Sequence, residues 1–186
     1  MTVYLVRHTS VANDRKLCYG QSEVRLAASF GEEAAVVSVK LPAVIDVCIS
    51  SPLTRCLRLA AYVCESRGLE FTTDNALKEL NFGAWEQKPW DSIGEEAVSG
   101  WAKDFVNNPC PGGESFAMLD ERVRRFWTAL GQQYGGDDEN VVLITHGGVI
   151  RSMLSYLGKA PLDKAFTFEV EPGDVVRVSA DGYRFV

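Results

Sequence analysis

The sequence is poor in groups that bind metals or cross-link chains. Its 186 residues include two histidines and five cysteines, and no Cys-x-x-Cys pair occurs. An odd number of cysteines without paired spacing argues against a disulfide framework or a zinc site and favours a reducing cytoplasm. We therefore expect neither a metal ion nor another cofactor.

Long apolar runs and an excess of positive charge are also lacking. The first apolar run ends at Arg7, and no segment reaches the roughly 18 apolar residues of a membrane span. A net charge of −6 argues against a general nucleic-acid binder. These features predict a cytoplasmic protein that acts on a small molecule, without nucleic-acid or membrane partners; a homodimer remains open.

The apolar pattern predicts an α/β protein of one domain. We expect strands at 2–7, 44–50, 71–75, 140–145, 166–170 and 175–178, and helices at 27–40, 53–67, 115–134 and 149–158. Ser51 and Pro52 suit the start of the second helix, and Gly68 its end. Segment 77–111 reads as an irregular, aromatic-rich insert in which Trp90 and Trp101 are candidates for a wall over substrate.

Each histidine follows an apolar, strand-like run. His8 comes after 3–6 and Arg7, and His146 comes after 141–144 and Thr145. Because open α/β sheets bind ligands beyond the carboxyl ends of their strands, we expect both histidines in one crevice. A neutral imidazole can attack phosphorus, and an arginine fork matches phosphate oxygens. Alone, Arg7-His8 is weak evidence, because a histidine that merely ends a strand is the commoner explanation of such a pair.

Two further strand-to-helix junctions strengthen the case for phosphate chemistry. Arg55 falls in the first turn of a predicted helix, where a cation is explained if a bound anion offsets it. Gly147 and Gly148 follow His146 and would let the backbone approach a ligand closely. A solvated arginine and an ordinary tight turn are the alternatives, but three such junctions together favour a phosphate site.

Five segments match, in order, the motifs of one known family. They are Arg7-His8-Thr9, Ser51-Pro52-Leu53-Thr54-Arg55, Glu79 with Phe82-Gly83-Ala84-Trp85-Glu86, Pro111-Gly112-Gly113-Glu114-Ser115, and Thr145-His146-Gly147-Gly148-Val149-Ile150-Arg151. The chain thus resembles the histidine phosphatase (phosphoglycerate mutase-like) superfamily over essentially its whole length. The resemblance implies a three-layer α/β/α sandwich with a mostly parallel mixed sheet, and a single domain over 1–186.

The same resemblance implies roles for particular residues. His8 would be the nucleophile that becomes phosphorylated, and Glu79 the proton donor, with His146 as the third catalytic residue. Arg7, Arg55 and His146 would hold the phosphoryl oxygens. A solvated loop carboxylate is the alternative for Glu79, and Glu86, its nearest rival, matches an element that we interpret as structural.

The sequence departs from the common pattern at two places, of which the first bears on the branch and the second implies only a local change of the backbone. Thr9-Ser10 stands where Gly-Glu is commonest, which argues against the main mutase and bisphosphatase branches, and Gln87 stands where Gly is usual. Residues 17–26 resemble the α-ribazole phosphatase branch of cobalamin biosynthesis, with Glu23 where Asp is usual. Tyr19 and Gln21 would then contact a nucleoside-like leaving group; a purely structural loop is the alternative.

The leading hypothesis is a metal-independent phosphomonoesterase that works through phosphohistidine and dephosphorylates α-ribazole 5′-phosphate. A broad-specificity phosphatase of sugar phosphates or nucleotides is the main alternative. Mutase activity and a non-catalytic phospho-ligand binder are further alternatives, although a binder would have little use for a proton donor.

Overall fold

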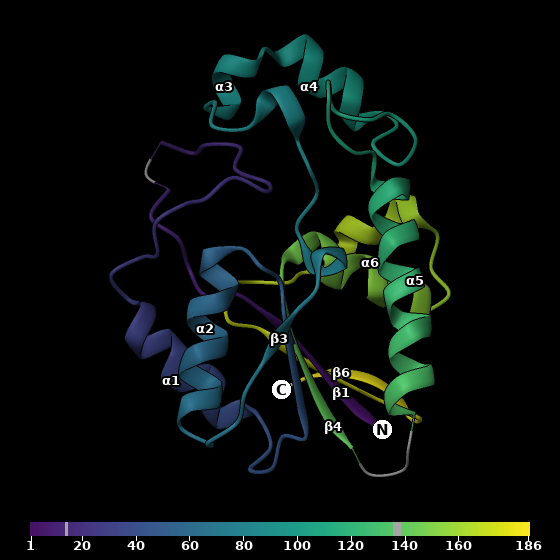
Figure 1. Cartoon of the computed structure of the whole chain (residues 1–186). Helices are drawn as coiled ribbons and strands as arrows, with labels where there is room; N and C mark the ends of the chain where they lie inside the picture. Colours follow the sequence, from purple (N-terminus) through teal and green to yellow (C-terminus); the bar gives the residue numbers. More distant parts are fainter. Residues whose placement is uncertain (14, 136–138) are drawn as a thin grey trace.

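One six-stranded sheet organises the computed structural model, which describes residues 1–13, 15–135 and 139–186. The strand order is β3-β2-β4-β1-β5-β6, in which β1 to β4 run parallel, β5 pairs antiparallel with β1, and β6 pairs antiparallel with β5 (Figure 1). The strands are β1 Thr2–Arg7, β2 Val47–Ser50, β3 Thr72–Thr73, β4 Asn140–Thr145, β5 Val175–Ser179 and β6 Gly182–Phe185. The predicted mostly parallel mixed sheet is confirmed.

Helices cover both faces of this sheet, as a three-layer sandwich requires. Helices α1 (Phe30–Lys40) and α2 (Thr54–Glu65) lie on one side, and α5 (Phe116–Tyr134) and α6 (Gly147–Leu157) lie on the other (Figure 1). Because side chains alternate along a strand, β1 feeds both cores. Val3 and Leu5 pack in the α5–α6 core, whereas Tyr4 and Val6 pack in the α1–α2 core.

Several predicted boundaries differ from the structure. Helix α2 begins at Thr54 rather than Leu53, because Leu53 is extended with φ −74° and ψ 137°. Ser51 is therefore not the helix cap and Pro52 lies outside the helix. At the other end, α2 stops at Glu65, two residues before the predicted Arg67. Gly68 has φ +62° and the N–H of Leu69 bonds the carbonyl of Cys64 at 3.1 Å, so the predicted glycine at the helix end is present. Helices α1 and α6 begin at Phe30 and Gly147, and β2 and β3 are shorter than expected.

The predicted strand at 166–170 is wrong. Residues Leu162–Thr167 form the 3₁₀ helix η3, and the closing hairpin pairs β5 with β6 instead. The alternating apolar residues that suggested a strand serve other contacts, since the Phe166 ring lies 4.9 Å from that of Phe105. The turn at Pro172-Gly173 is present, with Gly173 at φ +79°, and it leads into β5.

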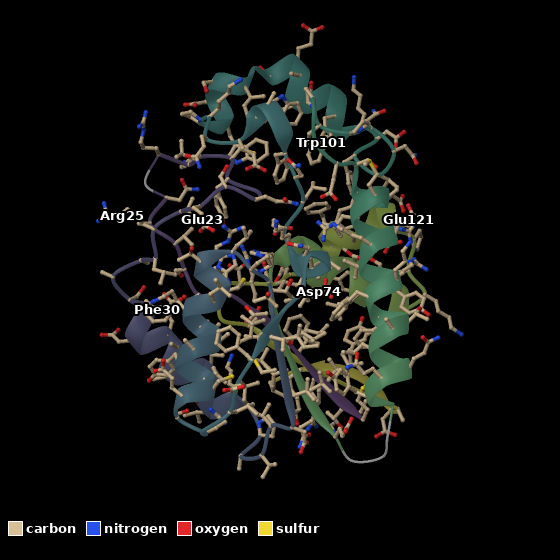
Figure 2. All side chains as sticks on the ribbon, in the orientation of Figure 1. Glu23, Arg25, Phe30, Asp74, Trp101 and Glu121 are labelled. Atoms are coloured by element: carbon tan, nitrogen blue, oxygen red, sulfur yellow. The ribbon has the colours of Figure 1, made fainter. Side chains whose placement is uncertain are left out.

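The aromatic insert is more ordered than the sequence suggested. It contains the short helices α3 (Trp90–Ile93) and α4 (Glu95–Ala102), with 3₁₀ turns η1 (Asn75–Leu77) and η2 (Gly83–Trp85) near its start. Trp85, Cys18 and Cys110 are buried in a small core there, against which Trp90 and Trp101 pack. Trp101 lies within this aromatic insert, above the sheet (Figure 2). No helix in the described ranges is both long and apolar enough to cross a membrane.

Candidate active site

Strand register brings the two histidines together. Strands β1 and β4 pair in parallel with Arg7 opposite Thr145, so His8 and His146 leave the sheet side by side. Their ring centroids are 5.1 Å apart at an interplanar angle of 64°. Both rings are buried, with 2% of His8 and none of His146 exposed. The two histidines therefore lie next to each other at the strand ends, as expected.

His8 is held as a neutral, oriented imidazole. Its Nδ1 lies 2.7 Å from the carbonyl oxygen of Thr9, which can only accept, so Nδ1 carries the proton and Nε2 keeps its lone pair. Burial, followed by the positive charge of Arg55, lowers the pKa of His8 to about 3 despite the bond to Thr9. A free ring nitrogen is thus available as a nucleophile at neutral pH.

Arg55 projects from the first turn of α2 into the site and is fully buried. It donates from Nη2 to the carbonyl of Gly20 at 2.6 Å and from Nη1 to that of Ser22 at 3.0 Å. Its Nε lies 3.3 Å from His146 Nδ1. No carboxylate among the described residues forms an ion pair with this buried guanidinium, which leaves its charge available to an anion.

Arg7 and Arg151 add two more cations. Arg7 donates from Nη1 to the carbonyl of Val170 at 2.6 Å, while its buried Nε has no partner. A Cβ placed on Gly147 would lie 3.4 Å from Arg7 Nε and 2.6 Å from Arg151 Nη1, so the two arginines flank this glycine. Because a buried donor without a partner costs free energy, Arg7 Nε marks a position suited to a phosphate oxygen.

His146 is fixed by contacts on both ring nitrogens. Besides the approach of Arg55 to Nδ1, its Nε2 lies 2.8 Å from the hydroxyl of Ser51. Burial and then the charge of Arg55 hold the pKa of His146 well below its usual range. Ser51 thus contacts a site residue instead of capping α2.

Glu79 reaches the same site from the loop after η1. Its Oε1 accepts the N–H of Leu80 at 2.9 Å, and its Oε2 accepts that of Gly148 at 3.2 Å, in the first turn of α6. A side chain at Gly148 would collide with Glu79 Oε1, so this glycine leaves the space that the carboxylate occupies. The nearest rival, Glu86, instead accepts the N–H groups of Gln21 at 2.9 Å and Phe82 at 3.1 Å.

Tyr19 and Gln21 lie beside Glu79 but differ in what they contact. Tyr19 lines a cavity of about 200 Å³, and the guanidinium of Arg55 lies 5.1 Å from its ring centroid. Other residues lining this cavity are Leu17, Cys18, Gly20, Glu79, Phe82 and Trp90. Gln21 directs its side-chain nitrogen to the carbonyl of Glu79 at 2.9 Å, so it supports the candidate acid. Trp101 does not line this cavity.

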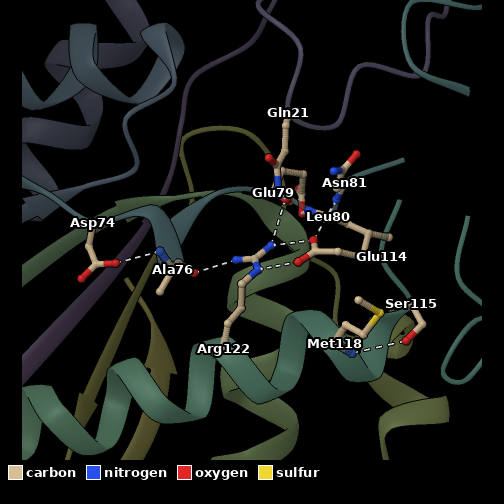
Figure 3. Close-up of polar contacts among 10 residues, drawn as sticks. All are labelled: Gln21, Asp74, Ala76, Glu79, Leu80, Asn81, Glu114, Ser115, Met118 and Arg122. Carbon is tan, nitrogen blue, oxygen red and sulfur yellow. Dashed lines mark hydrogen bonds and ion pairs between the residues drawn. The ribbon is translucent and has the colours of Figure 1, made fainter. Parts of the chain in front are cut away.

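Several residues that support the site were not predicted from the sequence. Glu23 accepts the N–H of Thr54 with both carboxylate oxygens, at 3.1 and 3.2 Å, and so caps the start of α2 beside Arg55. Arg122 and Glu114 brace the Glu79 segment (Figure 3). In the described part of the chain, no group of three or more His, Cys, Asp or Glu side chains is placed to hold a metal ion.

Comparison with known proteins identifies the family. Residues 3–186 match the model of the "Histidine phosphatase superfamily (branch 1)". A "Probable phosphoglycerate mutase GpmB" from Salmonella paratyphi B is 32% identical over 161 residues, covering 83% of this chain and 74% of that protein. The chain belongs to the histidine phosphatase superfamily, as the motifs predicted, and its enzyme class is that of a phosphatase.

Solved structures share the fold over the whole chain. A "putative alpha-ribazole-5'-P phosphatase" from Escherichia coli K-12 superposes with a TM-score of 0.87 at 26% identity, covering 100% of this chain and 94% of that one. The alpha-ribazole phosphatase from Shigella flexneri gives a TM-score of 0.88 at 24% identity, covering 100% and 95%. The predicted phosphoglycerate mutase-like α/β sandwich is confirmed.

Proposed function

We propose that the protein is a metal-independent phosphomonoesterase that works through a phosphohistidine on His8, as one domain in the cytoplasm. The observation that carries the proposal is the state of His8: neutral, buried, and oriented by the Thr9 carbonyl so that Nε2 keeps its lone pair. The unneutralised guanidinium groups of Arg7 and Arg55 supply the charge that a phosphoryl group requires.

In the first step, His8 Nε2 attacks phosphorus and forms an N–P bond while the ester P–O bond breaks. Arg7 and Arg55 stabilise the negative oxygens of the transferring group, with His146 beside them. The departing alkoxide takes a proton from the carboxyl group of Glu79. The products are an alcohol, phosphohistidine and the Glu79 carboxylate.

In the second step, water replaces the alcohol beside the phosphohistidine. The Glu79 carboxylate accepts a proton from this water as its oxygen attacks phosphorus and the N–P bond breaks. Phosphate leaves, and His8 and protonated Glu79 are restored. Positioning and charge stabilisation supply most of the acceleration.

For the substrate, we propose α-ribazole 5′-phosphate. Support comes from the Cys18-Tyr19-Gly20-Gln21 segment and from the likeness to the E. coli structure described by that activity. Tyr19 and Trp90 line the cavity beside Glu79, where an aromatic leaving group could pack. A broader phosphatase of sugar phosphates or nucleotides is the second candidate, favoured by Arg151, which forms no ion pair among the described residues and could hold an additional anionic group.

The test is phosphate release from α-ribazole 5′-phosphate in excess chelator, beside a panel of sugar phosphates and nucleotides. We expect the highest kcat/KM for α-ribazole 5′-phosphate, no turnover by the His8→Ala variant, and an acid-labile phosphoenzyme in the wild type. Full activity of His8→Ala would refute the mechanism. Flat selectivity would refute the substrate alone and favour the second candidate.

A further inference from the structure

An ion pair outside the phosphate site forms hydrogen bonds with the backbone around Glu79. Arg122, on α5, donates from Nε to Glu114 Oε1 at 2.9 Å and from Nη2 to Glu114 Oε2 at 3.0 Å (Figure 3). This is the two-point geometry in which a guanidinium and a carboxylate fix each other's orientation. The side chains are 20% and 17% exposed, so the pair is largely shielded from solvent.

The same two side chains bind the loop on both sides of Glu79. Arg122 donates from Nη1 to the carbonyl of Ala76 at 2.7 Å and from Nη2 to that of Glu79 at 3.0 Å. Glu114 Oε2 accepts the N–H of Asn81 at 2.9 Å (Figure 3). Residues 78–82 form neither helix nor strand, so no regular hydrogen-bond ladder fixes their backbone.

The position of this backbone determines the position of the Glu79 carboxylate. That carboxylate accepts the N–H of Leu80, inside the loop 78–82, and the N–H of Gly148, on α6. If the loop moves, the Leu80 donor and the Glu79 Cα move with it, while Gly148 stays. The carboxylate would then lose its placement between loop and helix.

We propose that Glu114 and Arg122 are positioning residues for proton transfer by Glu79; this rests on the proposed phosphohistidine mechanism. The two-point geometry is one in which an ion pair also stabilises the fold, but stability alone does not explain where the contacts of this pair are directed. Its contacts converge on one short segment, and that segment carries the only carboxylate bonded to the first turn of α6 among the described residues.

This role can be separated from a general structural one by the leaving group. The value of kcat/KM reports the steps up to transfer of phosphorus to His8. An alkyl ester such as α-ribazole 5′-phosphate needs a proton from Glu79 in that step, whereas 4-nitrophenolate departs as a stable anion. A positioning defect should therefore lower kcat/KM for the alkyl ester selectively, whereas a general defect should lower kcat/KM for both esters alike.

The experiment compares Arg122→Met and Glu114→Gln with Arg125→Met as the matched control. Arg125 lies on the same helix and pairs with Glu121 at the surface, away from Glu79. With Arg122→Met we expect kcat/KM for the alkyl ester to fall about 10²-fold, the cost of a misplaced catalytic group, and a much smaller loss with 4-nitrophenyl phosphate. Arg125→Met should leave both values unchanged.

A second comparison tests whether Arg122 acts through Glu79. In a Glu79→Gln background, adding Arg122→Met should cause no further loss on the alkyl ester, because the acid is already gone. Equal losses on both esters, or additive losses in the double variant, would overturn the inference while leaving the phosphatase intact. An inactive wild type would instead overturn the proposed function.

Folding of each variant is checked by thermal unfolding. If Arg122→Met does not fold, Arg122→Lys gives the same test, since one ammonium group cannot reproduce the two-point contact with Glu114 together with both carbonyl contacts. Selective loss with Arg122→Lys supports the positioning role, and wild-type values for both esters overturn it.

Discussion

The buried, neutral His8 should make the folded protein sensitive to acid. The pKa of His8 falls from 6.5 in the unfolded chain to about 3 in the folded protein, mainly because the site is buried and secondarily because Arg55 is close. Between these values the unfolded chain binds more protons than the folded one. Stability is therefore fully present above the unfolded pKa and is lost as pH falls toward the folded pKa.

The size of this loss follows from the two pKa values. Complete protonation would remove about 5 kcal/mol, and lowering the pH from 7 to 5 should remove about 2 kcal/mol through His8 alone. The low pKa of His146 acts in the same direction. Replacing His8 by Gln removes its titration and leaves that of His146 in place.

The assay is urea unfolding of wild type and His8→Gln at pH 7 and pH 5. We expect the free energy of unfolding of the wild type to fall by about 2 kcal/mol more than that of the variant over this range. Identical falls in both proteins would show that His8 is not held neutral by burial, and would remove the main argument for an available nucleophile at neutral pH.

Two further predictions concern groups around the site. Gly148→Ala should displace the Glu79 carboxylate and lower kcat/KM for an alkyl ester by about 10²-fold, with the affinity for phosphate little changed. Steady-state kinetics and inhibition by phosphate measure the two quantities, and an unchanged kcat/KM would contradict the prediction. Glu86→Ala should destabilise the fold by about 1–3 kcal/mol and raise KM, because Glu86 holds the loop whose carbonyls bind Arg55. Urea unfolding measures the first effect and steady-state kinetics the second, and an unaltered KM would count against the loop's role.

The sequence predicts the centre of the sheet well because its strands are short apolar runs that end in polar residues. His8 and His146 lie at such ends, and parallel pairing then places them together. Their junctions also carry glycine and arginine, whose chemistry is informative without coordinates. The fold class and the grouping of the histidines with Arg55 were therefore accessible from the sequence.

The wrong predictions arise where one sequence pattern is compatible with two different local structures. Apolar residues alternate over 166–170 as in a strand, but Phe166 and Phe168 pack against different aromatic neighbours, Phe105 and Tyr183. Ser51 before Pro52 resembles a helix cap, yet its hydroxyl lies 2.8 Å from His146. In each case a tertiary contact outweighed a local preference that the sequence alone displays.

Supporting residues are harder to predict because their partners are distant in sequence. Arg122 looks like one of several cations on the polar face of a helix, and nothing local distinguishes it from Arg125. Its contact with Ala76 spans 46 positions and its contact with Glu79 spans 43. Only the packing of α5 against the loop reveals which arginine faces inward.

The central place of β1 has a consequence for synthesis of the chain on the ribosome. β1 lies between β4 and β5, and Thr2 pairs with Asn140, so its neighbours are translated long after it. Until then this apolar strand has two unpaired edges, which can join strands of other chains. The nascent protein should therefore depend on chaperones through most of its translation, and activity should arise only when β4 has been made.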